Sequence, residues 1–134
     1  TDNRDINTTI ASEARELGVL VNVVDVPELC DFIVPAYVRR GDVTIAISTA
    51  GKSPALARKI RARLEQEFGE EYAALAQLVG EVRNELKELN TEADGETWQE
   101  ALDLDLLIAL LKKGEAGKAR AILLNSLKMT GGVA

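Results

Sequence analysis

The stretch LVNVVDVPELCDFIVPAYVRRGDVTIAIS, residues 20–48, decides the fold. It contains apolar, valine-rich runs of strand length at residues 20–24, 32–38 and 43–48. The first run is almost wholly apolar and predicts a buried strand of the kind found in parallel sheets. The other two runs are separated by Arg-Arg-Gly-Asp, which predicts a hairpin turn. We therefore expect one sheet strand followed by a hairpin.

Helical patterns flank this stretch on both sides. Residues 5–18 predict a short helix that ends at Gly18, so the first strand follows a helix as in the last part of a βαβ sheet. On the other side, Ser53 is a typical N-cap and Pro54 suits the first helical position. From there the periodicity predicts four amphipathic helices, at residues 54–68, 70–89, 98–111 and 116–127.

Two of these helices have a distinct apolar stripe. In the first, apolar residues recur every four positions and predict a buried face: Leu56, Ile60, Leu64 and Phe68. In the second, steps of three and four form a heptad seam, which packs against another helix either in a bundle or in a dimer. The seam consists of Tyr72, Leu75, Val79, Val82, Leu86 and Leu89.

Charge and composition exclude several classes of protein. Residues 39–63 hold seven basic residues and one acidic residue, so this segment carries +6 and the remainder of a chain with net charge −6 carries −12. A local anion site or a solvated helix face explains such a segment better than nucleic-acid binding, and aromatic residues make up only 4%. No apolar run approaches the length needed to span a membrane. A single cysteine, Cys30, suits a reducing cytoplasm.

The absence of histidine leaves carboxylates, hydroxyls and Cys30 for any acid–base or metal chemistry. Asp25 follows the first strand, where catalytic groups collect in open α/β sheets, although a turn or helix-cap role also fits its position before Pro27. Cys30 has an apolar setting that favours core packing. We assign no set of metal ligands.

The turn Gly51-Lys52-Ser53 is not a P-loop, because the glycine required five residues earlier is replaced by Ala46. It nevertheless combines a tight turn, a lysine and the unpaired N–H groups of a helix start. These features indicate an anion site, and an ordinary capped helix is the alternative.

Three segments together resemble one family: TDNRDIN (residues 1–7), residues 21–41, and VTIAISTAGKSPALARKIRARLE (residues 43–65). The family is that of the bifunctional precorrin-2 dehydrogenase/sirohydrochlorin ferrochelatases, which includes the amino-terminal module of sirohaem synthase. The resemblance implies an oxidoreductase that transfers hydride from precorrin-2 to NAD. In many members the same enzyme then inserts ferrous iron, as a substrate, to form sirohaem.

The resemblance also implies roles for individual residues. Asp25 matches the catalytic aspartate, expected to accept a proton, and Thr1 and Asn22 match positions next to NAD. The substrate is a tetrapyrrole with many carboxylates, and the expected residues that bind it are Arg40, Thr49, Gly51, Lys52 and Ser53. Some members carry a serine at the position of Thr49.

The implied fold class is α/β plus α. We expect the carboxyl-terminal remnant of a Rossmann-like NAD domain (residues 1–34), a hairpin and helix that form a homodimer (35–68) and a small helical domain (69–134). No glycine-rich turn occurs in the chain, so we expect it to be a fragment that binds NAD weakly. The alternative is a non-catalytic module for dimerisation or tetrapyrrole binding.

Overall fold

The computed structural model describes residues 2–24, 26–91 and 93–130, with the side chains of residues 129 and 130 excepted. The chain divides into two compact units. Unit 1 comprises Thr1–Tyr37 and Ala46–Arg63, and unit 2 comprises Val38–Ile45 and Leu64–Ala134. Because the division passes through the hairpin and the helix after it, each unit contains a part of both.

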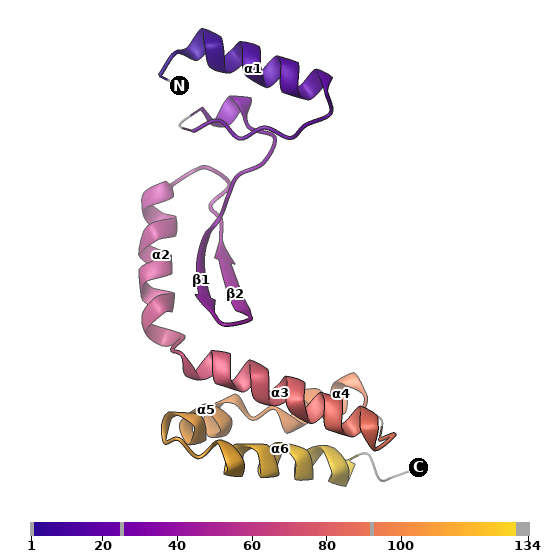
Figure 1. Ribbon diagram of the computed structural model, residues 1–134. Helices are drawn as coiled ribbons and strands as arrows, with labels where there is room; N and C mark the ends of the chain where they lie inside the picture. The colour runs from indigo at the N-terminus through magenta and orange to yellow at the C-terminus, as the bar shows by residue number, and fades with distance from the viewer. Residues whose placement is uncertain (1, 25, 92, 131–134) are drawn as a thin grey trace. The chain divides into compact units, whose positions relative to one another are not determined.

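Unit 1 begins with helix α1 (Arg4–Glu16), drawn in indigo in Figure 1. The side chain of Asn3 caps this helix and accepts hydrogen bonds from the backbone N–H groups of Asp5 and Ile6, at 3.0 and 3.2 Å. Past the carboxyl end, Gly18 has a φ of +70°, in the left-handed region that favours glycine. The predicted first helix and its glycine stop are therefore confirmed.

The predicted first strand, residues 20–24, is wrong for this chain: the structure assigns no strand there. A strand requires a neighbouring strand, and the described residues offer none to this run. Its backbone is bonded instead to residues 30 and 31, just after the short 3₁₀ helix η1 (Pro27–Leu29). The apolar pattern indicated a segment suited to a sheet, but among the described residues the two-stranded sheet of β1 and β2 does not include it.

The hairpin consists of β1 (Ala36–Arg40) and β2 (Val43–Ile47), which form a two-stranded sheet. This confirms the predicted hairpin and its turn, where Gly41 has a φ of +56°. Strand β1 starts at Ala36, later than the predicted start at residue 32. Pro35, directly before it, has no N–H to donate to a strand partner.

Helix α2 (Pro54–Glu67) starts where the sequence predicts, and Ser53 Oγ accepts a hydrogen bond of 3.1 Å from the N–H of Leu56. The prediction of a buried stripe is wrong for Leu56 and Ile60, which are 51% and 36% exposed. Periodicity identifies an apolar face, but it does not show whether the chain supplies a partner to cover that face.

The helices of unit 2 are α3 (Glu71–Glu88), α4 (Gly95–Ala101), α5 (Leu104–Lys112) and α6 (Ala116–Thr130). Helix α3 packs against α5 and α6, which lie beside it in Figure 1. The heptad seam of α3 thus packs in a bundle within the chain, although its last residue, Leu89, is 54% exposed. The buried core of the bundle consists of Leu75, Leu78, Val82, Leu86, Ala101, Leu107, Ile108, Ala119, Leu123 and Leu127.

The single helix predicted at residues 98–111 is in fact two. Asp103 interrupts it, because its side chain accepts a 3.0 Å hydrogen bond from the N–H of Leu106 and thereby caps α5. Asp94 caps α4 in the same way through the N–H of Thr97, at 2.8 Å. None of the helices in the described part of the chain is long and apolar enough to cross a bilayer.

Candidate functional site

The turn that leads from β2 into α2 brings together Thr49, Gly51, Lys52 and Ser53. The hydroxyl of Thr49 accepts from the N–H of Ser53 at 3.1 Å and lies 3.2 Å from the Ser53 carbonyl, to which it donates. The N–H of Lys52 donates to the Thr49 carbonyl at 3.0 Å. Thr49 and Ser53 therefore hold the turn in shape through their own hydrogen bonds.

The backbone at the tip of this turn favours glycine at position 51. Ala50 and Gly51 have φ values of 50° and 77°, both in the left-handed region. A Cβ atom at position 51 would also lie 3.3 Å from the Cδ1 atom of Ile33. The turn is thus closely packed on one side.

The side chain of Lys52 is exposed beside the start of α2. Among the described residues no carboxylate pairs with it. A positive charge next to the N–H groups of a helix start attracts an anion. The turn therefore has the chemistry to receive a carboxylate.

Arg40 belongs to unit 2, whereas the Thr49–Ser53 turn belongs to unit 1. Its guanidinium donates to the carbonyls of Phe68 at 2.8 Å, Glu65 at 3.1 Å and Arg39 at 2.9 Å. A carboxylate oxygen of Glu70 lies 3.4 Å away. Arg40 thus satisfies carbonyls at the carboxyl end of α2 and ties the hairpin to it.

Asp25 and Thr1, the expected catalytic residue and one of the two expected NAD contacts, lie outside the described residues. Asn22, the other expected NAD contact, is exposed and its amide donates to the carbonyl of Phe32 at 2.8 Å. This hydrogen bond fixes Asn22 against the segment that leads to the hairpin.

Cys30 forms hydrogen bonds on both sides of the position of Asp25. Its Sγ atom lies 3.2 Å from the N and O atoms of Val23 and 3.4 Å from the carbonyl oxygen of Val26. The sulfur accepts a hydrogen bond from the N–H of Val23, and its single proton can be donated to only one of the two carbonyls at a time. Cys30 is half-buried and shapes this loop, a role that the sequence did not predict.

Asp31 links three segments of unit 1. Its carboxylate accepts from Arg15 Nε of α1 at 2.9 Å and from the N–H of Val21 at 3.0 Å. Arg15 also donates to the carbonyl of Leu29 at 2.9 Å. The hydrogen bond from Arg15, followed by that from Val21, lowers the pKa of Asp31 below its usual 3.8.

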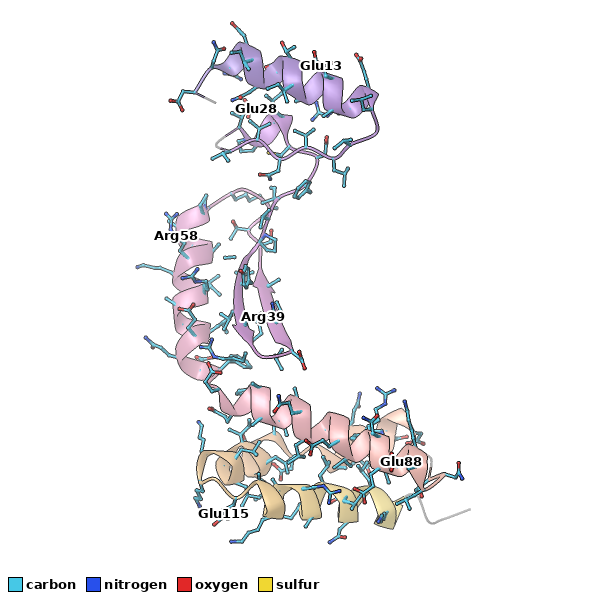
Figure 2. All side chains as sticks on the ribbon, in the orientation of Figure 1. Glu13, Glu28, Arg39, Arg58, Glu88 and Glu115 are labelled. Atoms are coloured by element: carbon cyan, nitrogen blue, oxygen red, sulfur yellow. The ribbon has the colours of Figure 1, made fainter. Side chains whose placement is uncertain are left out.

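A pocket of ≈ 680 Å³ lies in unit 1, between α1 and the loop that follows it. At its rim, Arg4 of α1 forms an exposed ion pair of 2.7 Å with Glu28, which is labelled in Figure 2. The sequence did not predict this ion pair, because the two residues lie 24 positions apart and no local pattern connects them. The lining residues are Asp2, Arg4, Asn7, Ile10, Val21, Asn22, Val23, Val24, Val26 and Glu28.

The described residues include no group of three or more acidic, cysteine or histidine side chains that could hold a metal ion.

Two family models match the chain. The model described as "Putative NAD(P)-binding" matches residues 1–36, and "Sirohaem biosynthesis protein central" matches residues 40–67. "Siroheme synthase" of Methylococcus capsulatus is 38% identical over 128 residues, which cover 94% of this chain and 27% of that protein. The corresponding protein of Hydrogenovibrio crunogenus is 40% identical over 124 residues, covering 92% and 26%. The chain belongs to the sirohaem synthase family.

The chain spans only about a quarter of the length of these curated relatives. A solved structure described as "SirC, precorrin-2 dehydrogenase" superposes with a TM-score of 0.50 at 27% identity, over 73% of this chain and 47% of that one. Within the sirohaem synthase family, the NAD(P)-binding match includes Asn22 and the pocket, and the central match includes Arg40 and the Thr49–Ser53 turn. The sequence-predicted family is therefore confirmed.

Proposed function

We propose that this chain is part of an enzyme that oxidises precorrin-2 to sirohydrochlorin with NAD. The observation that carries the proposal is the alignment of nearly the whole chain with siroheme synthases, supported by the likeness to a precorrin-2 dehydrogenase. A second step at the same site inserts ferrous iron, as a substrate, to give sirohaem.

Asp25 is the proposed proton acceptor. Oxidation of precorrin-2 sends a hydride to NAD and releases a proton from the tetrapyrrole, and a carboxylate next to the reacting carbon can take that proton. Cys30 holds the backbone of Val23 and Val26, on either side of Asp25. A defined loop conformation would keep the carboxylate within reach of the substrate.

NAD supplies the hydride acceptor when it is bound. The described residues fit only part of it: Asn22 and the pocket rim offer polar groups, but no glycine-rich turn at a helix start is present to hold the pyrophosphate. We therefore expect this chain alone to bind NAD weakly.

The tetrapyrrole carboxylates are the proposed ligands of the turn at the start of α2. Lys52 supplies an exposed charge, Gly51 lets the backbone approach closely, and Thr49 and Ser53 hold the turn in shape. Arg40 is included among the proposed tetrapyrrole ligands because it matches a basic position of the family, although its N–H groups already donate to backbone carbonyls.

A second copy of the chain is the proposed partner of the hairpin and α2. The exposed apolar side chains of Leu56 and Ile60 on α2, together with Tyr37 on β1, which is 56% exposed, support this. We place the enzyme in the cytoplasm, where a lone thiol such as Cys30 remains reduced.

A titration tests tetrapyrrole binding directly. Sirohydrochlorin is added to the chain at several salt concentrations, and binding is followed by its absorption. We expect binding that weakens with salt, a loss of about tenfold in affinity for Lys52→Ala and a shallower salt dependence. Lys113→Ala, on an exposed lysine after α5, is the matched control. Equal affinity of the Lys52→Ala and wild-type chains would contradict the proposed site.

Activity separates the enzyme from the non-catalytic alternative. A protein that joins this chain to a complete NAD(P)-binding domain should form NADH from NAD and precorrin-2, and Asp25→Ala should abolish this while sirohydrochlorin still binds. Tetrapyrrole binding without any NADH formation would favour the binding module.

A further inference from the structure

The loop between Val23 and Cys30 is closed at its base by two successive sets of hydrogen bonds. The N–H of Asp31 donates to the carbonyl of Val21 at 2.8 Å, and the N–H of Val21 donates to the Asp31 carboxylate at 3.0 Å. One step further into the loop, the Sγ atom of Cys30 lies 3.2 Å from both the N and the O atom of Val23. The segment that enters the loop is therefore fastened to the segment that leaves it.

Arg15 fastens this base to α1 at two points. Its Nε atom donates to Oδ1 of Asp31, and one of its terminal nitrogens donates to the carbonyl of Leu29, the last residue of η1, each at 2.9 Å. A planar guanidinium that uses two donors at once fixes the direction as well as the distance of the groups it holds. Both oxygens of Asp31 are engaged, because Oδ2 accepts from the N–H of Val21. Such a carboxylate is suited to holding the loop rather than to receiving a proton itself.

A second ion pair also joins α1 to this loop, but it is more exposed. The side chains of Arg4 and Glu28 are 75% and 57% exposed, whereas those of Arg15 and Asp31 are 43% and 24% exposed. An exposed pair with a single contact does little to hold a structure, because water and salt screen it. Arg15 and Asp31 are therefore the charged residues that fix the base of the loop against α1.

The loop closed in this way contains Asp25, the proposed proton acceptor. We propose that Arg15 and Asp31 are positioning residues for proton transfer to Asp25. Neither contacts the reacting atoms. They restrict the backbone on both sides of Asp25, so that its carboxylate is within reach of the proton for a larger fraction of the time. The inference rests on the proposed function, in which precorrin-2 gives its hydride to NAD and its proton to this carboxylate.

Hydrogen exchange of the chain, without NAD or tetrapyrrole, tests whether the pair holds the loop. Arg15→Gln removes both contacts from α1 to the base of the loop, so the amides of Val21 and Val23 should exchange at least about tenfold faster. The amides of α1 around the buried residue Ala11 should keep their rates, which shows that the helix stays folded.

Kinetics of the whole enzyme that contains this chain test the positioning role itself. For Arg15→Gln we expect kcat for NADH formation to fall at least about tenfold, while KM for precorrin-2 and for NAD stays within about twofold. Arg15→Lys keeps the charge and one donor, so it should recover part of the lost rate. The double variant of Arg15→Gln with Asp31→Asn should be no slower than the slower single variant, because both changes break the same contact. A role in stability alone would leave kcat of the folded enzyme unchanged.

Arg120→Gln is the matched control. It breaks the ion pair between Arg120 and Glu85 in the helical bundle, whose side chains are 44% and 28% exposed, close to the values for Arg15 and Asp31. This variant should change neither the exchange of the Val21 amide nor kcat.

Three results overturn the inference: unchanged exchange of Val21 and Val23 in Arg15→Gln, an unchanged kcat despite faster exchange, or a KM that rises while kcat stays constant. Failure of the proposed function is a different result, in which the unsubstituted enzyme forms no NADH or Asp25→Ala retains full activity. The positioning role then falls with it, whatever the exchange rates are.

Discussion

A Cβ atom on Gly41 would lie 2.9 Å from the Cβ atom of Ala73. The turn of the hairpin thus approaches the first turns of α3 more closely than a side chain at position 41 would permit. Gly41 also has a φ of +56°, which other residues rarely adopt. Both the contact and the backbone conformation require glycine, and together they hold the hairpin turn against the helical bundle within unit 2.

We predict that Gly41→Ala lowers the free energy of unfolding by about 2 kcal/mol, because it adds both overlap and backbone strain. Chemical denaturation followed by circular dichroism measures it. The control is Gly80→Ala in the middle of α3, where an added Cβ meets no heavy atom within 4 Å. That variant should gain up to about 1 kcal/mol from helix propensity. Equal stability of the two variants would contradict the close packing at position 41.

The thiol of Cys30 should stabilise the folded chain through its hydrogen bonds to Val23. Cys30→Val retains an apolar side chain of similar size but removes these bonds, so we expect a loss of about 1 kcal/mol and faster hydrogen exchange at the Val23 amide. Cys30→Ser retains a donor and an acceptor and should lose less. If Cys30→Val matches the wild type in both measurements, packing alone explains the residue.

The Asp31 carboxylate should make stability depend on pH. Its pKa is lowered in the folded chain, first by the hydrogen bond from Arg15 and then by that from Val21, so the ionised form stabilises the fold. This contribution is full above the unfolded value, 3.8, and is lost as pH falls below it through the folded pKa. The difference in melting temperature between wild type and Asp31→Asn should therefore shrink as the solution is acidified toward about pH 3. A difference that stays constant down to that pH would contradict a stabilising role of the ionised Asp31 carboxylate.

Asp103 should contribute to stability as the cap of α5. Asp103→Ala removes the acceptor for the N–H of Leu106 and should cost about 1 kcal/mol in the free energy of unfolding. Asp103→Ser offers another capping oxygen and should restore most of this. The helical signal during urea unfolding provides the measurement, and full stability of Asp103→Ala would show that the cap is dispensable.

The exposed face of α2 should determine self-association. Leu56→Lys or Ile60→Lys replaces an exposed apolar side chain with a charge, and either should weaken a dimer that buries this face. Sedimentation equilibrium measures the monomer–dimer constant. Leu104→Lys on α5, a leucine that is likewise 51% exposed, should leave it unchanged. If none of the three substitutions changes the monomer–dimer constant, the interface lies elsewhere.

The sequence by itself determined the local features of this protein. The turn at Gly41, the cap at Ser53, the Gly18 stop and the seam of α3 all follow from backbone geometry, capping and periodicity, which act within a few residues. The family also followed from short motifs that are continuous in sequence. For the proposed site this means that the Thr49–Ser53 turn could be predicted from its residues alone.

Only the tertiary structure decided which apolar segments find a partner. Residues 20–24 have the composition of a buried strand, and Leu56 and Ile60 that of a buried stripe. Yet Leu20, Val24 and both α2 side chains remain exposed, because burial requires a neighbour that the pattern cannot supply. The hydrogen bonds of Arg40, Cys30 and Asp31 could not be predicted from the sequence either. Apart from the bond between Arg40 and its neighbour Arg39, each joins positions between 4 and 28 residues apart. A contact over such a separation depends on how the chain folds back on itself.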